Sequence, residues 1–221
     1  MLTVHHLNNS RSQRVLWLLE ELGVAYEVRR YERDAKTLLA PPALRAVHPL
    51  GKSPILTDGE TTVAESGAII EYLVGRYGAG RLIPPAGSAE RLRYTYWLHY
   101  AEGSAMPPLL LNLIFSRVAA TPSWPISVIA RGIAAKVQSG FIAPQLRLHF
   151  DYVESELARQ AWFAGAEFTA ADIQMSFPLE AAAHRAGITA GRPRILEFLN
   201  SIHARAAYQR ALARGGHYDY A

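Results

Sequence analysis

The sequence contains no cysteine. A disulfide framework, a thiolate zinc site, an iron–sulfur cluster and a protein-thiol nucleophile are therefore excluded. Any thiol chemistry would need a sulfur atom that a ligand supplies. Lysine is scarce as well, because only Lys36, Lys52 and Lys136 occur among the 23 basic side chains. A lysine inside a motif is therefore informative.

Long apolar runs and clustered charges are also missing. The longest apolar candidate, Leu109–Phe115, is far shorter than the ~20 residues of a membrane span, and Met1–Leu7 lacks the features of a signal peptide. The net charge of +4 is small, and the sequence has no Lys/Arg run. Nucleic-acid binders, in contrast, concentrate basic residues on one stripe. We expect a cytoplasmic protein without a membrane or nucleic-acid partner.

The eight histidines do not suggest a metal centre. His5 and His6 are neighbours on a predicted strand, so they point to opposite faces, and the sequence has no HExxH pattern. No metal is expected.

The first 77 residues alternate between strand and helix patterns. Strands are predicted at Leu2–Leu7, Tyr26–Tyr31, Pro54–Thr57 and Thr61–Ala64, helices at Ser12–Leu22 and Ser66–Arg76, and short turns in Lys36–Val47. The order β-α-β-α-β-β-α predicts an open mixed sheet with helices packed on it.

The composition changes after this region. Tyr77–Ser88 is rich in Gly and Pro and is predicted to be a linker. Helices are predicted beyond it at Glu90–Ala105, Ile126–Arg159, Thr169–Ala186 and Pro193–Arg205, and Pro107-Pro108 should kink or end the first. We therefore predict an α/β domain at residues 1–77 and an all-α domain at residues 88–221.

Two motifs of the first domain place polar groups beside free backbone. In Glu65-Ser66-Gly67, Ser66 is a good N-cap, and a helix N-terminus can bind a carboxylate. In His48-Pro49-Leu50-Gly51-Lys52-Ser53-Pro54, Pro54 opens a strand and cannot donate to the sheet. In a third motif, Asn9-Ser10-Arg11-Ser12, Ser10 also has the spacing of a capping box with Gln13.

The second domain has a structural motif, Phe168-Thr169-Ala170-Ala171-Asp172-Ile173. Thr169 is predicted to cap a helix and Asp172 to bond back to the cap.

The architecture and these motifs together resemble the cytosolic glutathione transferases, in which a thioredoxin-like domain precedes an all-helical domain. The resemblance covers nearly the whole chain. The segment His6–Arg14 with Trp17–Leu22 is similar to a bacterial and fungal subgroup with a serine-type site. Further support comes from Arg33-Asp34-Ala35, Ala40-Pro41-Pro42, His48-Pro49-Leu50-Gly51 and Arg205–Ala211.

The resemblance implies a detoxifying transferase that joins the glutathione thiolate to an apolar electrophile. It also implies a cytoplasmic homodimer that uses glutathione as co-substrate and no metal. Glutathione would be held by a cis Pro54, by Ser53, by Glu65 and Ser66 at the γ-glutamyl end, and by Lys52 or Lys36 at the glycyl end. Glu102 is expected to reach the glutathione amine of the partner subunit.

The reaction needs a thiolate, which a donated hydroxyl beside a helix N-terminus can stabilise. Spacing back from Arg14 favours Ser10 for this role, with Asn9 and Ser12 as alternatives. We expect Met106, Leu110 and Trp124 to line the electrophile pocket, with Tyr218 and Tyr220 as a lid.

Two other functions fit the same resemblance. One is disulfide or peroxide reduction with two glutathiones, in which Asn9 would matter more. The other is glutathione or ligand binding without efficient turnover.

Overall fold

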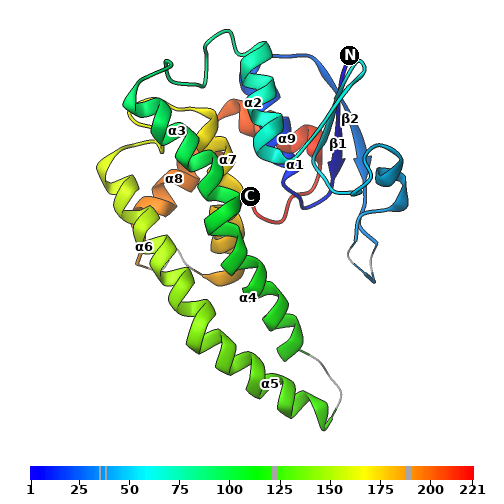
Figure 1. Cartoon of the computed structure of the whole chain (residues 1–221), viewed down its shortest axis with the longest axis vertical. Coiled ribbons are helices and arrows are strands. Elements are labelled where there is room, and N and C mark those ends of the chain that lie inside the picture. Colours follow the sequence, from blue (N-terminus) through cyan, green and yellow to red (C-terminus); the bar gives the residue numbers. More distant parts are fainter. Residues whose placement is uncertain (35, 38, 121–123, 188–190) are drawn as a thin grey trace.

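A computed structural model describes residues 1–34, 36–37, 39–120, 124–187 and 191–221. Ala35, which closes one of the motifs above, lies outside the described residues. The order of elements follows the predicted pattern, a small sheet with helices and then a long series of helices (Figure 1).

Four strands form a mixed sheet, which confirms the predicted fold class. They are β1 (Leu2–Leu7), β2 (Tyr26–Tyr31), β3 (Ile55–Asp58) and β4 (Thr61–Ala64), in the spatial order β2-β1-β3-β4. β1 runs parallel to β2, with Val4 opposite Val28, and antiparallel to β3, with Val4 opposite Leu56. The central strand is therefore buried, and the carboxyl end of β1 leads directly to the first helix.

Two helices and a short turn complete this part: α1 (Ser12–Leu22), η1 (Pro42–Ala46) and α2 (Ser66–Tyr77). Helix α1 buries its apolar stripe Val15, Leu18, Leu19 and Leu22, and ends at Gly23 with a φ of 68°. A left-handed residue at this position satisfies a terminal carbonyl, and glycine adopts it at no steric cost.

The second part is helical. Its elements are α3 (Ala89–Tyr100), η2 (Ala101–Ala105), α4 (Met106–Ala119), α5 (Ile126–Val137), η3 (Gln138–Ile142), α6 (Ala143–Arg159), α7 (Ala170–Ala186), α8 (Pro193–His203) and α9 (Ala206–Gly215). Helix α9 returns to α1, and one apolar cluster runs through both parts. Thr169 and Asp172 form the predicted capping box of α7.

The structure corrects the prediction for Pro107-Pro108. These prolines do not end the helical run, because a π-turn, η2, precedes them and α4 continues beyond. The Met106 N–H donates to the Ala101 carbonyl, five residues earlier. Proline has no N–H and cannot make the usual bond to the fourth preceding carbonyl, so a wider turn accommodates the pair. Glu102 lies in this turn.

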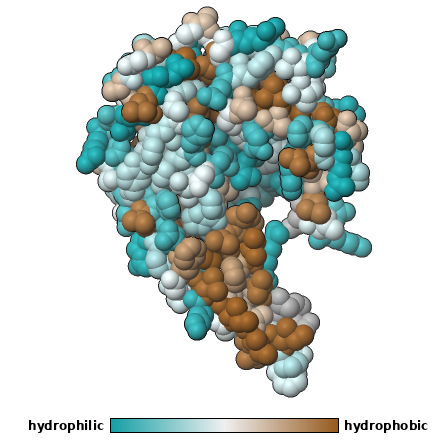
Figure 2. All heavy atoms as spheres, viewed as in Figure 1, coloured by the Kyte–Doolittle hydropathy of each residue, from teal (hydrophilic) through white to brown (hydrophobic). Residues whose placement is uncertain are grey.

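Helices α4 and α5 project from the rest of the molecule as an arm (Figure 1), and an apolar face covers it (Figure 2). By length and composition alone, the helical run Ile126–Arg159 would suffice to cross a membrane, with 17% of its most apolar window buried. The later part of the run packs Phe150 and Val153 completely into the core. The run is therefore a core helix at one end and an exposed apolar surface at the other.

Candidate functional site

A cleft of about 520 Å³ opens where β3, the N-terminus of α2 and the turn η2 meet. The peptide bond between Ser53 and Pro54 at its edge is cis, as the family resemblance implied. The residues that line the cleft are Leu7, Arg11, Arg33, Leu39, Ala40, His48, Leu50, Lys52, Ser53, Pro54, Ala64, Glu65, Ser66, Glu102 and Leu110. The cleft thus collects Lys52, Ser53, Pro54, Glu65, Ser66 and Glu102, all predicted to bind glutathione.

The N-terminus of α2 differs in detail from the prediction. Glu65, not Ser66, occupies the N-cap, with a φ of 71° and no side-chain capping bond. A bulky residue with positive φ is unusual and costs on the order of 1–3 kcal/mol. Ser66 is the first helical residue and is buried. The first N–H groups of α2 therefore begin at the cleft wall beside a carboxylate.

The buried side chain of Arg14 connects three elements around the cleft, α2, α7 and η2. Its guanidinium is 1% exposed and donates to Ser66 Oγ at 2.9 Å, to the Gln174 carbonyl at 2.6 Å and to Glu102 at 2.5 Å. Glu102 also pairs with Arg11 Nε at 3.0 Å. Burial would raise the pKa of Glu102, but Arg14 and Arg11 together hold it below its usual value. Glu102 is therefore a carboxylate that two arginines of its own chain fix in the cleft.

The three candidates for thiol activation have different surroundings. The Asn9 amide is paired with Asp219 at both ends, at 2.7 Å and 2.9 Å. Ser12 Oγ is buried beside His6 Nδ1 at 2.8 Å and the Leu7 carbonyl at 3.3 Å. Ser10 is 4% exposed and does not line the cleft. Its Oγ lies 3.5 Å from Oγ of Ser53, which does line the cleft.

Ser10 has the more adaptable hydroxyl. Its Oγ accepts from the Ser12 N–H at 3.2 Å and lies 2.7 Å from Ser12 Oγ. The Ser53 hydroxyl donates to the His5 carbonyl at 3.0 Å, so its oxygen is left as an acceptor. The Ser10 hydrogen can therefore point to Ser12, to Ser53 or to an anion beside them.

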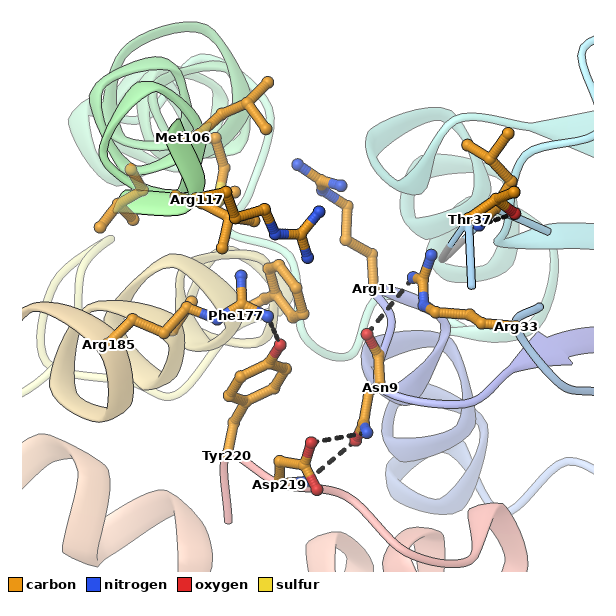
Figure 3. A pocket seen from close by; sticks show the side chains of 15 residues that line it. Asn9, Arg11, Arg33, Thr37, Met106, Arg117, Phe177, Arg185, Asp219 and Tyr220 are labelled. Carbon is orange, nitrogen blue, oxygen red and sulfur yellow. Dashed lines mark hydrogen bonds between the residues drawn. The ribbon is translucent and has the colours of Figure 1, made fainter. Parts of the chain in front are cut away.

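A second cavity of about 440 Å³ adjoins the cleft and shares Arg11, Arg33, Leu39 and Leu110 with it. Its lining comes from the loop after β1, from the segment after β2, from α4 and α7 and from the C-terminal segment (Figure 3). The residues are Asn9, Arg11, Arg33, Thr37, Leu39, Met106, Leu109, Leu110, Leu113, Arg117, Phe177, Ala181, Arg185, Asp219 and Tyr220. Met106 and Leu110, two of the residues expected in an electrophile pocket, both line this cavity.

Lys36 and Trp124, like Ser10 and Ser12, line neither cavity. Lys36 is exposed, and its backbone N–H bonds to Asp34 Oδ1 at 3.0 Å. Trp124 is 82% exposed at the far end of the α4–α5 arm, which carries it away from the pocket. Of the two proposed lid residues, Tyr220 lines the second cavity, whereas Tyr218 is buried and donates to Glu180 at 2.6 Å.

Sequence reasoning missed the arginines of the site. One signal for Arg11 was available in the sequence. A cation at a helix N-terminus opposes the helix dipole, and α1 has Arg11 at its N-cap and no acidic residue in its first turn, so this unfavourable position suggested a partner or a role elsewhere. Its partner Glu102 is distant in the sequence.

Among the described residues, no cluster of three or more His, Asp or Glu side chains could hold a metal ion.

Comparisons with known proteins give a consistent result. The family model for the glutathione S-transferase N-terminal domain matches residues 1–75, and the model for the C-terminal domain matches residues 143–206. Glutathione S-transferase 3 of Schizosaccharomyces pombe is 41% identical over 82% of this chain and 74% of its own length. Glutathione S-transferase 1 of Saccharomyces cerevisiae is 34% identical over 99% and 98%.

Solved structures agree. The crystal structure of a glutathione S-transferase from Actinobacillus pleuropneumoniae has a TM-score of 0.78 and 32% identity, and the likeness covers 97% of this chain and 93% of that one.

Proposed function

The chain belongs to the glutathione S-transferase family, and we propose that it joins glutathione in the first cleft to an apolar electrophile in the second cavity. The observation that carries this proposal is the shared wall of the two cavities, formed by Arg11, Arg33, Leu39 and Leu110. A sulfur atom at this wall would meet an electrophilic carbon without crossing bulk water. Fixing two reactants side by side supplies much of a catalyst's advantage.

The polar groups of the cleft support a definite placement of glutathione. Its γ-glutamyl carboxylate would lie at the N-terminus of α2 near Ser66, and its ammonium beside Glu65. The cysteinyl backbone would pair with Ser53 beside the cis Pro54, and the glycyl carboxylate would face Lys52.

Glu102 is available to the glutathione amine of its own cleft. It lines the same cleft as Glu65 and Ser66. We therefore propose a role within one subunit for Glu102, in place of the contact across a dimer expected from the resemblance.

We propose Ser10 as the residue that activates the thiol. A free thiol has a pKa of about 8.5, so a donor that favours the thiolate raises the reactive fraction at neutral pH. Ser10 supports this role because its hydrogen can turn to the sulfur while its oxygen keeps the Ser12 N–H. The amide of Asn9 is occupied by Asp219 and the Ser12 hydroxyl by His6 and Leu7.

In the proposed reaction the thiolate attacks an electrophilic carbon, a C–S bond forms, and the leaving group departs with the electron pair of its own bond. The N-terminal N–H groups of α1 and the Ser10 hydroxyl stabilise the sulfur anion before attack. The apolar wall of α4 keeps water from the electrophile.

We also propose that the protein is a cytoplasmic homodimer. The exposed apolar face of α4 and α5, which includes Ile114, Ile126, Ile129 and Ile133 (Figure 2), supports the dimer, because large exposed patches mark contact surfaces. Light scattering of Ile129→Glu should then report a monomer. A dimeric variant would contradict a contact through this face.

The experiment for the activity compares three assays: conjugation of chlorodinitrobenzene, reduction of a hydroperoxide, and reduction of hydroxyethyl disulfide. We expect retention on immobilised glutathione and conjugation as the main activity. Ser10→Ala should lose most conjugation, and Asn9→Ala should retain more of it. Full activity in Ser10→Ala with loss in Asn9→Ala would contradict the assignment, and failure to bind glutathione would end the proposal.

A further inference from the structure

The second cavity combines an apolar wall with converging positive charge. Met106, Leu109, Leu110 and Leu113 lie at helical spacing on α4, and Phe177 on α7 adds to the wall. Arg117 continues the α4 stripe one turn beyond Leu113. Figure 3 shows Arg117 directed into the same space as Arg11 and Arg33.

Four guanidinium groups face this space, those of Arg11, Arg33, Arg117 and Arg185, and among the described lining residues the only carboxylate is Asp219. The Asp219 carboxylate already accepts from the Asn9 amide at 2.7 Å and pairs with His217 at 2.7 Å. Arg11 pairs with Glu102, which lies outside this cavity and divides its single negative charge between Arg11 and Arg14. The cavity therefore holds an excess of positive charge.

The arginines influence one another. Burial lowers the pKa of Arg33, and Arg11 and Arg117 lower it further. Burial also lowers the pKa of Arg185, with added repulsion from Arg117 and Arg33, which Asp219 opposes. Guanidinium groups held close together in a partly desolvated space favour a bound anion, which would relieve their repulsion.

We propose that the electrophile is an apolar acid, whose hydrocarbon body packs on α4 and Phe177 and whose carboxylate binds at Arg117 and Arg185. This inference rests on the proposed conjugation and adds the substrate class. Seven residues separate Leu110, which borders the glutathione cleft, from Arg117. At 1.5 Å per residue this is about 10 Å along α4, so the reacting carbon and the carboxylate lie at opposite ends of the substrate.

A second glutathione unit would also bring carboxylates, as disulfide reduction requires. The wall favours the apolar acid, because Met106, Leu109, Leu113 and Phe177 offer no hydrogen bonds to a peptide.

The test uses a matched pair of electrophiles, a chlorodinitrobenzoate and its methyl ester. They share the reacting ring and differ in one negative charge. kcat/KM for each is divided by its uncatalysed rate with glutathione, which removes the difference in intrinsic reactivity. The variants are Arg117→Ala, Arg117→Lys and, as a control, Arg147→Ala, an exposed arginine of α6 outside both cavities.

We expect the wild-type protein to prefer the acid to the ester by about tenfold or more, the effect of one charged hydrogen bond. Arg117→Ala should lower kcat/KM for the acid about tenfold and reduce the acid-to-ester ratio, and Arg117→Lys should restore part of it. Arg147→Ala should leave both rates unchanged. Glutathione affinity should be the same in all variants, which shows that they are folded.

Three results would overturn the inference. The first is that the wild-type protein shows no preference for the acid, and the second is that Arg117→Ala lowers kcat/KM equally for acid and ester. The third is that Arg117→Ala loses disulfide reduction while its acid-to-ester ratio stays that of the wild-type protein. The last result would assign the cavity to a second glutathione. Conjugation of the ester alone would remove this inference and leave the proposed function intact. Conjugation of neither electrophile would remove both.

Discussion

The buried Arg14 provides a sharp test of how the glutathione cleft is held in shape. The substitution Arg14→Gln removes a guanidinium that is 1% exposed, together with its bonds to Ser66, Gln174 and Glu102. A buried acceptor that loses its donor costs about 1–3 kcal/mol, and Arg14→Gln leaves two of them. Glu102 keeps Arg11 as a partner and its side chain is 32% exposed, so most of this cost comes from the two stranded acceptors, Ser66 and the Gln174 carbonyl.

A total loss of about 2–6 kcal/mol should lower the Tm by roughly 4–24 °C, since 1 kcal/mol corresponds to about 2–4 °C in a protein of this length. Arg11→Gln is the matched control, because it removes a guanidinium from the same carboxylate. Arg11 is 36% exposed, and such pairs contribute about 1 kcal/mol or less. Tryptophan fluorescence during urea unfolding gives the free energy of unfolding of both variants, and a thermal scan gives their Tm. Equal losses in Arg14→Gln and Arg11→Gln would refute the reasoning.

Three further predictions concern binding, pH and folding. Glu65→Gln should weaken glutathione binding by about tenfold or more in calorimetry, because it removes one charged partner of the ammonium; unchanged affinity would contradict the placement. Burial and Arg30 lower the pKa of His6 from 6.5 to about 4, so the unfolded chain binds the extra proton between these values. Stability should therefore fall by up to about 3 kcal/mol from pH 6.5 to 4, and His6→Asn should flatten this dependence in urea midpoints, whereas an equally steep curve would contradict it. Asp172→Ala should cost about 2 kcal/mol or more in thermal unfolding, because it removes acceptors at 2.8 Å and 2.7 Å from the N–H groups of Phe163 and Thr169; a neutral effect would contradict a structural role.

Local patterns predicted much of the fold. The apolar spacing and Gly23 placed α1 at Ser12–Leu22, and the capping box of α7 came from a short motif. Each of these features depends on residues that are neighbours in the sequence. Their physics is therefore visible without the structure.

The cationic cavity could not be predicted in this way. Arg11, Arg33, Arg117 and Arg185 come from four separate segments, and in the sequence their charges look dispersed. Only the packing of α4 and α7 beside the loops that follow β1 and β2 brings them together. The continuation of the helix past Pro107 could not be predicted either. Whether a proline ends a helix depends on the geometry of the turn before it, here the π-turn η2.

The most direct test of the central claim is the pKa of the glutathione thiol in the complex, measured by the ultraviolet absorbance of the thiolate across a pH titration. If the cleft binds glutathione and Ser10 donates to its sulfur, the pKa should fall from about 8.5 to below 7. In Ser10→Ala it should return most of the way, while glutathione remains bound. A bound thiol that titrates like free glutathione in the wild-type protein would contradict the claim.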